Sequence, residues 1–116
     1  MLKFAIKNEY YKGKIIGYLY YDEQNQTYEI EIPKNVKSFE APFIISDFIK
    51  KNQYKIGNDW SYRWVCQRVT PPERQNICQI LKANQMTEYD EFKLLVKNEG
   101  RSCQDECYIE KIDGRV

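Results

Sequence analysis

Hydrophobic and polar residues alternate along the first third of the chain, which is the period of a half-buried β-strand. The alternation is clear in residues 1–7 and again in residues 27–32, and the segment 13–21 between them is rich in β-branched and aromatic side chains. Gly13 predicts a turn before this middle strand, and Gly17 predicts a bulge or a close backbone approach within it. The polar run D-E-Q-N-Q then closes a hairpin. We therefore expect an antiparallel meander of three strands.

The alternation stops after Pro33, and the segment up to Pro42 is expected to be an irregular connection. Residues 43–51 place their apolar side chains on one broad face and end in lysines, which favours a short helix. Residues 59–69 are ambiguous. Their tryptophan and tyrosine positions alternate as in a strand, but the two tryptophans also share a helical face.

Two more helices are expected between residues 70 and 100. Thr70 is a candidate N-cap, with Pro71 at the first helical position and Glu73 as the capping-box partner. Thr87 is expected to cap the second helix in the same way, and Gly100 to end it.

A last strand is expected over residues 106–112, where it could return to the meander. With 116 residues, the chain is long enough for one domain with a modest core. The pattern as a whole predicts a single α+β domain over residues 1–116. We expect a small antiparallel sheet of about three or four strands, with about three to four helices packed on one side.

Composition argues against most catalytic functions. The chain has no histidine, no glycine-rich phosphate loop and no nucleophile beside a base. The best acidic candidates, Asp22, Glu23, Glu29 and Glu31, fit a solvated strand face, as do several of the ten tyrosines. We expect no enzymatic activity, no catalytic residue and no cofactor.

Charge and hydropathy restrict the binding partners and the cellular location that we expect for the protein. Eighteen basic and 17 acidic residues leave a net charge of +1, which does not favour direct binding to nucleic acid. The first residues have charges every few positions and no apolar run of the length that a signal peptide or membrane span requires. We expect a cytoplasmic protein that does not associate with membranes.

The four cysteines are expected to be free thiols, because a cytosolic compartment keeps them reduced. Cys103 and Cys107 are close in sequence, but no histidine or second close pair completes a zinc set, so no metal site is expected. Cys66 and Cys78 are interpreted as small core residues, and the other two as flanking a turn.

Aromatic and arginine residues cluster between residues 60 and 74, with the composition of a protein-binding hot spot. The alternative is that the two tryptophans simply fill the core. Our hypothesis is that at least one tryptophan projects into a cleft of a partner, with arginines pairing acids at the rim. The candidate partner-binding residues are Trp60, Tyr62, Arg63, Trp64, Arg68 and Arg74.

The order of these motifs resembles the N-terminal subdomain of HipA-type kinases. That subdomain opens with a G-x-x-V/I-G-x-L hairpin and continues with a P-E helix start, a D-x-F-x-L-L helix and a glycine. Arg74 stands where the family usually has glycine, and R-S-C-Q-D-E-C replaces its small-residue tail. The matching positions are Gly13, Ile16, Gly17, Leu19, Pro72, Glu73, Asp90, Phe92, Leu94, Leu95 and Gly100.

The resemblance implies a function, because free-standing copies of this subdomain occur in three-component toxin–antitoxin systems. There the small protein neutralises a shorter kinase toxin, and a helix-turn-helix protein binds the operator. The present chain contains no phosphate-cradling loop or catalytic loop, so no kinase core is expected in it. The resemblance therefore implies a bacterial antitoxin that binds a HipA-like serine/threonine kinase, and that contacts a helix-turn-helix repressor only through a larger complex.

Two alternatives remain open. The chain could be a phage- or plasmid-encoded inhibitor or adaptor of another host protein. The helix pair over residues 71–99 could instead be a helix-turn-helix module, but Glu88, Asp90 and Glu91 crowd the end that would meet the DNA.

Overall fold

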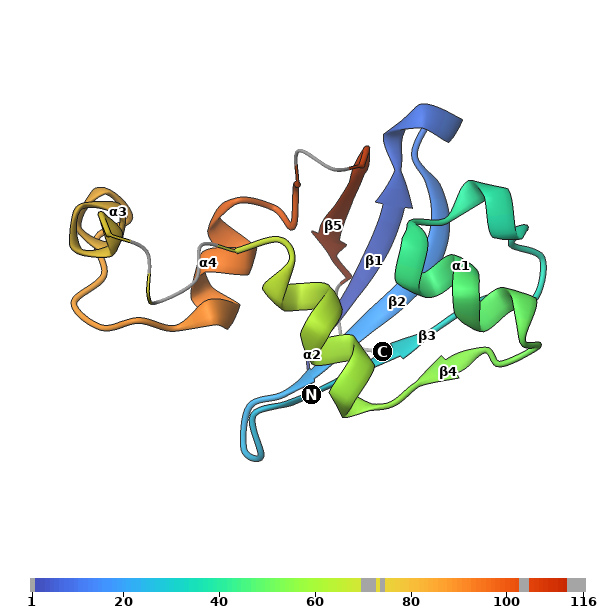
Figure 1. Cartoon of the computed structure of the whole chain (residues 1–116), viewed down its shortest axis with the longest axis horizontal. Helices are drawn as coiled ribbons and strands as arrows, with labels where there is room; N and C mark the ends of the chain where they lie inside the picture. Colours follow the sequence, from blue (N-terminus) through green and yellow to red (C-terminus); the bar gives the residue numbers. More distant parts are fainter. Residues whose placement is uncertain (1, 70–72, 74, 103–104, 113–116) are drawn as a thin grey trace.

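A computed structural model describes residues 2–69, 73, 75–102 and 105–112 (Figure 1). Within them, five strands form one antiparallel sheet in the order β4-β3-β2-β1-β5. The strands are β1 (Leu2–Asn8), β2 (Lys14–Asp22), β3 (Thr27–Glu31), β4 (Lys55–Ile56) and β5 (Cys107–Lys111). The helices are α1 (Phe43–Lys50), α2 (Asn58–Cys66), α3 (Ile77–Ala83) and α4 (Glu91–Lys97), with 3-10 turns η1 (Glu9–Tyr11) and η2 (Ser38–Glu40).

The fold is α+β, as expected, but the sheet has five strands where three or four were predicted. The meander β1–β2–β3 and the returning strand β5 were anticipated. The additional strand is β4, which pairs Ile56 with Ile30 and Lys55 with Glu31. A strand of two residues is too short to show alternation, so only its pairing with β3 reveals it.

One face of the sheet forms the core. Phe4 on β1 pairs with Leu19 on β2, Leu19 pairs with Ile30 on β3, and Ile6 on β1 pairs with Ile109 on β5; all five are buried. Figure 1 shows α1, α2 and α4 against this side of the sheet, with α3 farther from it. The period-two pattern therefore sorts the sheet into a covered apolar face and an open polar one.

Two glycines in the hairpin motif have the roles that the sequence suggested. Gly13 has a φ of 76° at the turn between β1 and β2. Gly17 lies beside a shift in the β1–β2 register, and a Cβ there would stand 3.4 Å from the carbonyl oxygen of Glu31. Both positions favour a residue without a side chain.

The ambiguous segment is a helix. In α2, Ser61, Trp64 and Val65 are buried on one side, which is helical spacing, whereas an alternating strand would not bury neighbours. The helix expected over residues 43–51 is confirmed as α1.

Of the two helix starts predicted after residue 70, the second was wrong, and the first falls on residues that the structure does not describe. Thr70, Pro71 and Pro72 lie outside the described residues, but Glu73 is in a turn and α3 begins only at Ile77. Residues 73–76 have no apolar side chain to bury, so capping signals alone did not extend the helix.

The cap of α4 is Asp90, not Thr87. The Asp90 carboxylate accepts hydrogen bonds from the backbone N–H groups of Phe92 (3.0 Å) and Lys93 (3.2 Å). Starting here directs Leu94 and Leu95 into the core, whereas Val96 is exposed. Packing therefore selected one of two plausible caps.

Gly100, at the end of α4, is expected to be essential for the packing of this helix on β5. Its φ is 66°, and a Cβ would lie 2.9 Å from Cγ2 of Ile109. Gly100→Ala should lower the free energy of unfolding by about 1–3 kcal/mol, measured by urea denaturation. The control is Gly57→Ala, whose Cβ would meet no atom within 4 Å; it should stay within about 1 kcal/mol of the wild type. Equal effects of the two substitutions would contradict this explanation.

Candidate protein-interaction surface

Helix α2 is fixed to the sheet by polar contacts near its amino end. The Ser61 hydroxyl donates to the carbonyl oxygen of Ile56 (3.0 Å), and the Asn58 side chain accepts from the N–H of Tyr28 (2.8 Å). Trp64 and Val65 are fully buried beneath the helix. The helix is therefore held in one orientation, and its opposite side faces solvent.

The outer side of α2 displays an aromatic and cationic cluster. Trp60 is 46% exposed and Tyr62 is 44% exposed. The Arg63 guanidinium lies 4.7 Å from the centroid of the Trp60 ring, and Phe48 of α1 meets the same ring edge-to-face at 6.3 Å. A surface hollow of about 350 Å³ lies beside them, lined by Asn58, Asp59, Trp60, Tyr62 and Arg63. We call Trp60, Tyr62 and Arg63 the α2 cluster.

Tyr62 is held by its own helix. The hydrogen bond between its hydroxyl and the Cys66 thiol, one turn away, raises the pKa of Tyr62 above its usual value. The phenol is therefore neutral at physiological pH. The α2 cluster thus presents a neutral phenol, an indole and a cation, a combination suited to contact with another protein surface.

Two of the predicted partner-binding residues are buried. Trp64 is 0% exposed and Arg68 is 5% exposed. The Arg68 guanidinium stacks 4.1 Å from the Trp64 ring centroid and donates to the carbonyl oxygen of Gly100 (2.9 Å) and to both carboxylate oxygens of Asp105. In this structure neither residue presents surface to a partner. Arg74 lies outside the described residues.

A second exposed aromatic group was missed from sequence. Tyr10 and Phe39 are each 71% exposed, and both rings contact Tyr11 edge-to-face, at 4.9 and 6.2 Å. Phe43, at the start of α1, is 80% exposed. A signal was available for Tyr10 and Phe39, because they lie outside the predicted strands and helices, where no periodicity would bury them. Phe43 lies in the predicted helix 43–51, and its exposure was not foreseen.

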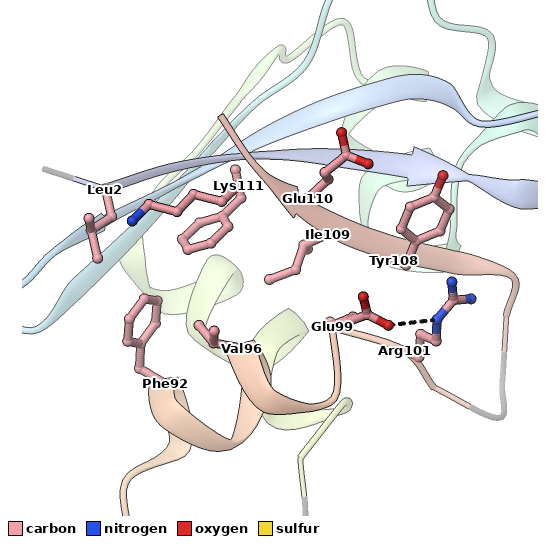
Figure 2. A pocket seen from close by; sticks show the side chains of 10 residues that line it. Leu2, Phe92, Val96, Glu99, Arg101, Tyr108, Ile109, Glu110 and Lys111 are labelled. Atoms are coloured by element: carbon pink, nitrogen blue, oxygen red, sulfur yellow. Dashed lines mark ion pairs between the residues drawn. The ribbon is translucent and has the colours of Figure 1, made fainter. Parts of the chain in front are cut away.

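A pocket of about 550 Å³ lies between α4 and β5 (Figure 2). Its inner wall is apolar, and its rim carries charges of both signs, with Arg101 and Glu99 paired at 3.7 Å. None of the lining side chains is a nucleophile with an adjacent base, so the pocket offers packing surface and not a reactive centre. The lining residues are Leu2, Phe4, Phe92, Val96, Glu99, Arg101, Tyr108, Ile109, Glu110 and Lys111.

The other candidate chemical groups are dispersed. Tyr21 and Tyr28 are buried on the core face, where burial raises the pKa of each, while Tyr18 and Tyr20 lie on the opposite face of β2. Asp22 organises the hairpin turn by accepting from the N–H groups of Gln24 and Asn25. Among the described residues, no group of three or more His, Cys, Asp or Glu could hold a metal ion.

The cysteines also differ from expectation. Cys66 and Cys78, interpreted as core residues, are exposed, because the helices that contain them turn other positions toward the core. Cys107 is buried on β5, and burial raises the pKa of its thiol to about 12.

Comparisons of the chain with protein-family models, with curated proteins and with solved structures gave no significant match. In the described part of the chain, no helix combines the length and the apolar character needed to cross a membrane.

Thiol alkylation should separate the cysteines by exposure. In the native protein at neutral pH, iodoacetamide should modify Cys66 and Cys78 and leave Cys107 intact, because Cys107 is buried and fully protonated. Peptide mapping by mass spectrometry measures each site. The same reaction in denaturant is the control and should label Cys107; modification of Cys107 at native rates equal to those of Cys66 would contradict its burial.

Arg68 should be a stability residue. Arg68→Met keeps an apolar stem against Trp64 but removes the donors to Asp105 and Gly100, leaving Asp105 without its cation. The free energy of unfolding should fall by about 2–4 kcal/mol, measured by urea denaturation. Arg63→Met, which changes an exposed arginine of α2, is the matched control and should change stability by less than about 1 kcal/mol. A larger loss for Arg63→Met than for Arg68→Met would exclude the assigned role.

Proposed function

We propose that this chain is a non-catalytic protein-binding module that binds and neutralises a HipA-like serine/threonine kinase in the bacterial cytoplasm. The observation that supports binding is the α2 cluster, in which an indole, a phenol and a guanidinium are exposed together on a rigidly anchored helix. Tryptophan, tyrosine and arginine are the residue types that dominate interface energetics. A partner contact centred here loses little conformational entropy, because the helix is already ordered.

The kinase as partner rests on the motif resemblance. The hairpin glycines stand at a left-handed turn and a close strand approach, and Gly100 stands where α4 meets Ile109. Asp90 caps α4, and Leu94 and Leu95 enter the core. These motif positions therefore have structural roles in this chain, and the order of the motifs along the sequence is what supports the kinase proposal. The partner itself is inferred from the family.

The mechanism that follows is steric. The Trp60 side chain would enter a cleft of the kinase, and Arg63 would pair with acidic groups at its rim. A total buried area near 1,600 Å² is typical of stable complexes, so contacts around α2, including Phe48, would have to contribute as well. The inhibitor of another host protein remains the second candidate, because the α2 cluster fits any partner with an apolar cleft and an acidic rim.

A helix-turn-helix function is less well supported. Residues 84–90 separate α3 from α4, whereas the helices of a helix-turn-helix are joined by a turn of about 3–4 residues. The amino end of α4 also carries Asp90 as its cap and Glu91 in the first turn, and both repel phosphates.

Trp60 should be the strongest contact. Co-expression with a HipA-like kinase should give a complex and rescue growth, and Trp60→Ala should weaken binding by about 30-fold or more, as for a hot-spot residue. Affinity is measured by isothermal titration calorimetry with purified partners, and growth rescue is scored in parallel.

Phe43→Ala is the matched control, because Phe43 is also a large exposed aromatic but belongs to α1. It should leave the affinity within about threefold of the wild type. Unchanged binding and unchanged rescue by Trp60→Ala would remove the α2 cluster from the mechanism. Failure of the wild type to bind the kinase at all would remove the kinase as the partner.

A further inference from the structure

The uncovered face of the sheet carries charge in stripes that follow the strands. Lys3 and Lys7 point to this face from β1, and Glu29 and Glu31 point to it from β3. The strand between them, β2, contributes uncharged aromatic side chains. A basic stripe and an acidic stripe therefore flank the central strand at the spacing of neighbouring strands, about 4.8 Å to each side.

The central stripe consists of Tyr18 and Tyr20. The Lys3 ammonium lies 4.6 Å from the Tyr18 ring centroid and 5.5 Å from that of Tyr20. The Tyr20 hydroxyl donates to the Glu31 carboxylate at 3.0 Å. Both rings are thus held in place on the open face, where they offer large contact area at little entropic cost.

The outer strands continue the pattern with reversed signs. Across the sheet at the level of Tyr18, the paired residues run in the order Glu110, Ala5, Tyr18, Glu31 and Lys55. In this row Glu110 on β5 and Lys55 on β4 have opposite charges, and β1 contributes the uncharged Ala5; in the row of Tyr20 the flanking residues are Lys3 on β1 and Glu29 on β3. Two pairs of opposite charge therefore lie at matching positions on the two sides of β2: Lys3 with Glu29, and Glu110 with Lys55. Lys7 has no paired residue on β3 and instead forms an ion pair with Glu110 of the same chain at 3.0 Å.

This antisymmetry has a geometric consequence. A twofold axis lying along β2 in the plane of contact would place β1 of one copy over β3 of the other, and β5 over β4. Lys3 would then face Glu29 of the second copy, since both are paired with the same residue, Tyr20. We propose that the open face of the sheet is a self-complementary surface that pairs two copies of this chain face to face, with their tyrosines in contact along the axis.

Other occupants fit the face less well. A twofold axis perpendicular to the strands would place each strand over the same strand of the second copy, so that like charges would meet. The three lysines (Lys3, Lys7, Lys55) and three glutamates (Glu29, Glu31, Glu110) cancel, so a polyanion or an anionic membrane gains no net attraction. The twofold axis along β2 keeps the strands of the two copies nearly parallel, as in the aligned packing of two sheets.

The interface would be small. Four strands with about five residues each and β4 with two, about 4.8 Å apart and at about 3.3 Å per residue, give a footprint of roughly 350 Å² per copy. The total is below the roughly 1,000 Å² expected of a stable interface, so the dimer should be weak, salt-sensitive and dependent on concentration. The surface is separate from the α2 cluster, because α2 covers the other face of the sheet. The proposal therefore does not depend on the kinase.

The test uses charge reversal at the Lys3–Glu29 pair, which a twofold axis repeats twice. Glu29 is exposed and has no ion-pair partner among the described residues, and Lys3 contacts only tyrosine rings there, so neither reversal should unfold the protein. Sedimentation equilibrium from about 10 μM to 1 mM, at low and high salt, gives the dissociation constant. Lys3→Glu and Glu29→Lys should each weaken self-association by about tenfold or more.

An equimolar mixture of the two single variants should recover association, because each heterodimer contains two opposite-charge pairs; the Lys3→Glu/Glu29→Lys double variant should also recover it. Lys93→Glu, an exposed reversal on α4, is the matched control and should behave as the wild type. Circular dichroism confirms that each variant is folded. A wild type that stays monomeric throughout, a dimer unaffected by the single reversals, or a mixture that does not associate would each overturn the proposal.

Discussion

The buried guanidinium of Arg68 joins three segments that are distant in sequence. It stacks on Trp64 of α2, donates to Gly100 after α4, and pairs with Asp105 before β5. Asp105 in turn accepts from the N–H of Cys107. A buried cation is tolerated only where such partners satisfy it. The side chain therefore fixes where α2 ends, where α4 stops and where the last strand enters the sheet.

That arrangement decides which side chains remain available for binding. Because Trp64 and Arg68 are used inside the fold, the outward positions of α2 are left with Trp60, Tyr62 and Arg63. The same anchoring orders the helix before any partner arrives. The proposed binding role uses these exposed aromatic side chains on an ordered helix.

The sheet separates two kinds of surface. Its apolar face is covered by helices, and the outer side of α2 lies beyond them, whereas its polar face is open and striped by charge. Contacts at one surface therefore do not block the other. A module built in this way can combine a partner contact through α2 with self-association through the sheet, and each can be altered by substitutions that leave the other intact.

The sequence by itself determined the α+β class, the β1–β2–β3 meander, α1, the roles of Gly13 and Gly17, and the aromatic composition of the region that became α2, because periodicity and turn chemistry are local. Tertiary structure alone decided that residues 58–66 are helical, that Asp90 and not Thr87 caps α4, and that a fifth strand forms at residues 55–56. It also buried Trp64 and Arg68 while exposing Trp60. The physical reason is that alternative local structures, such as two possible helix caps, can be similar in free energy, so the tertiary contacts that each can make determine which one forms. In this chain the contacts around α2 are made with Ile56, Gly100 and Asp105, which come from other parts of the sequence.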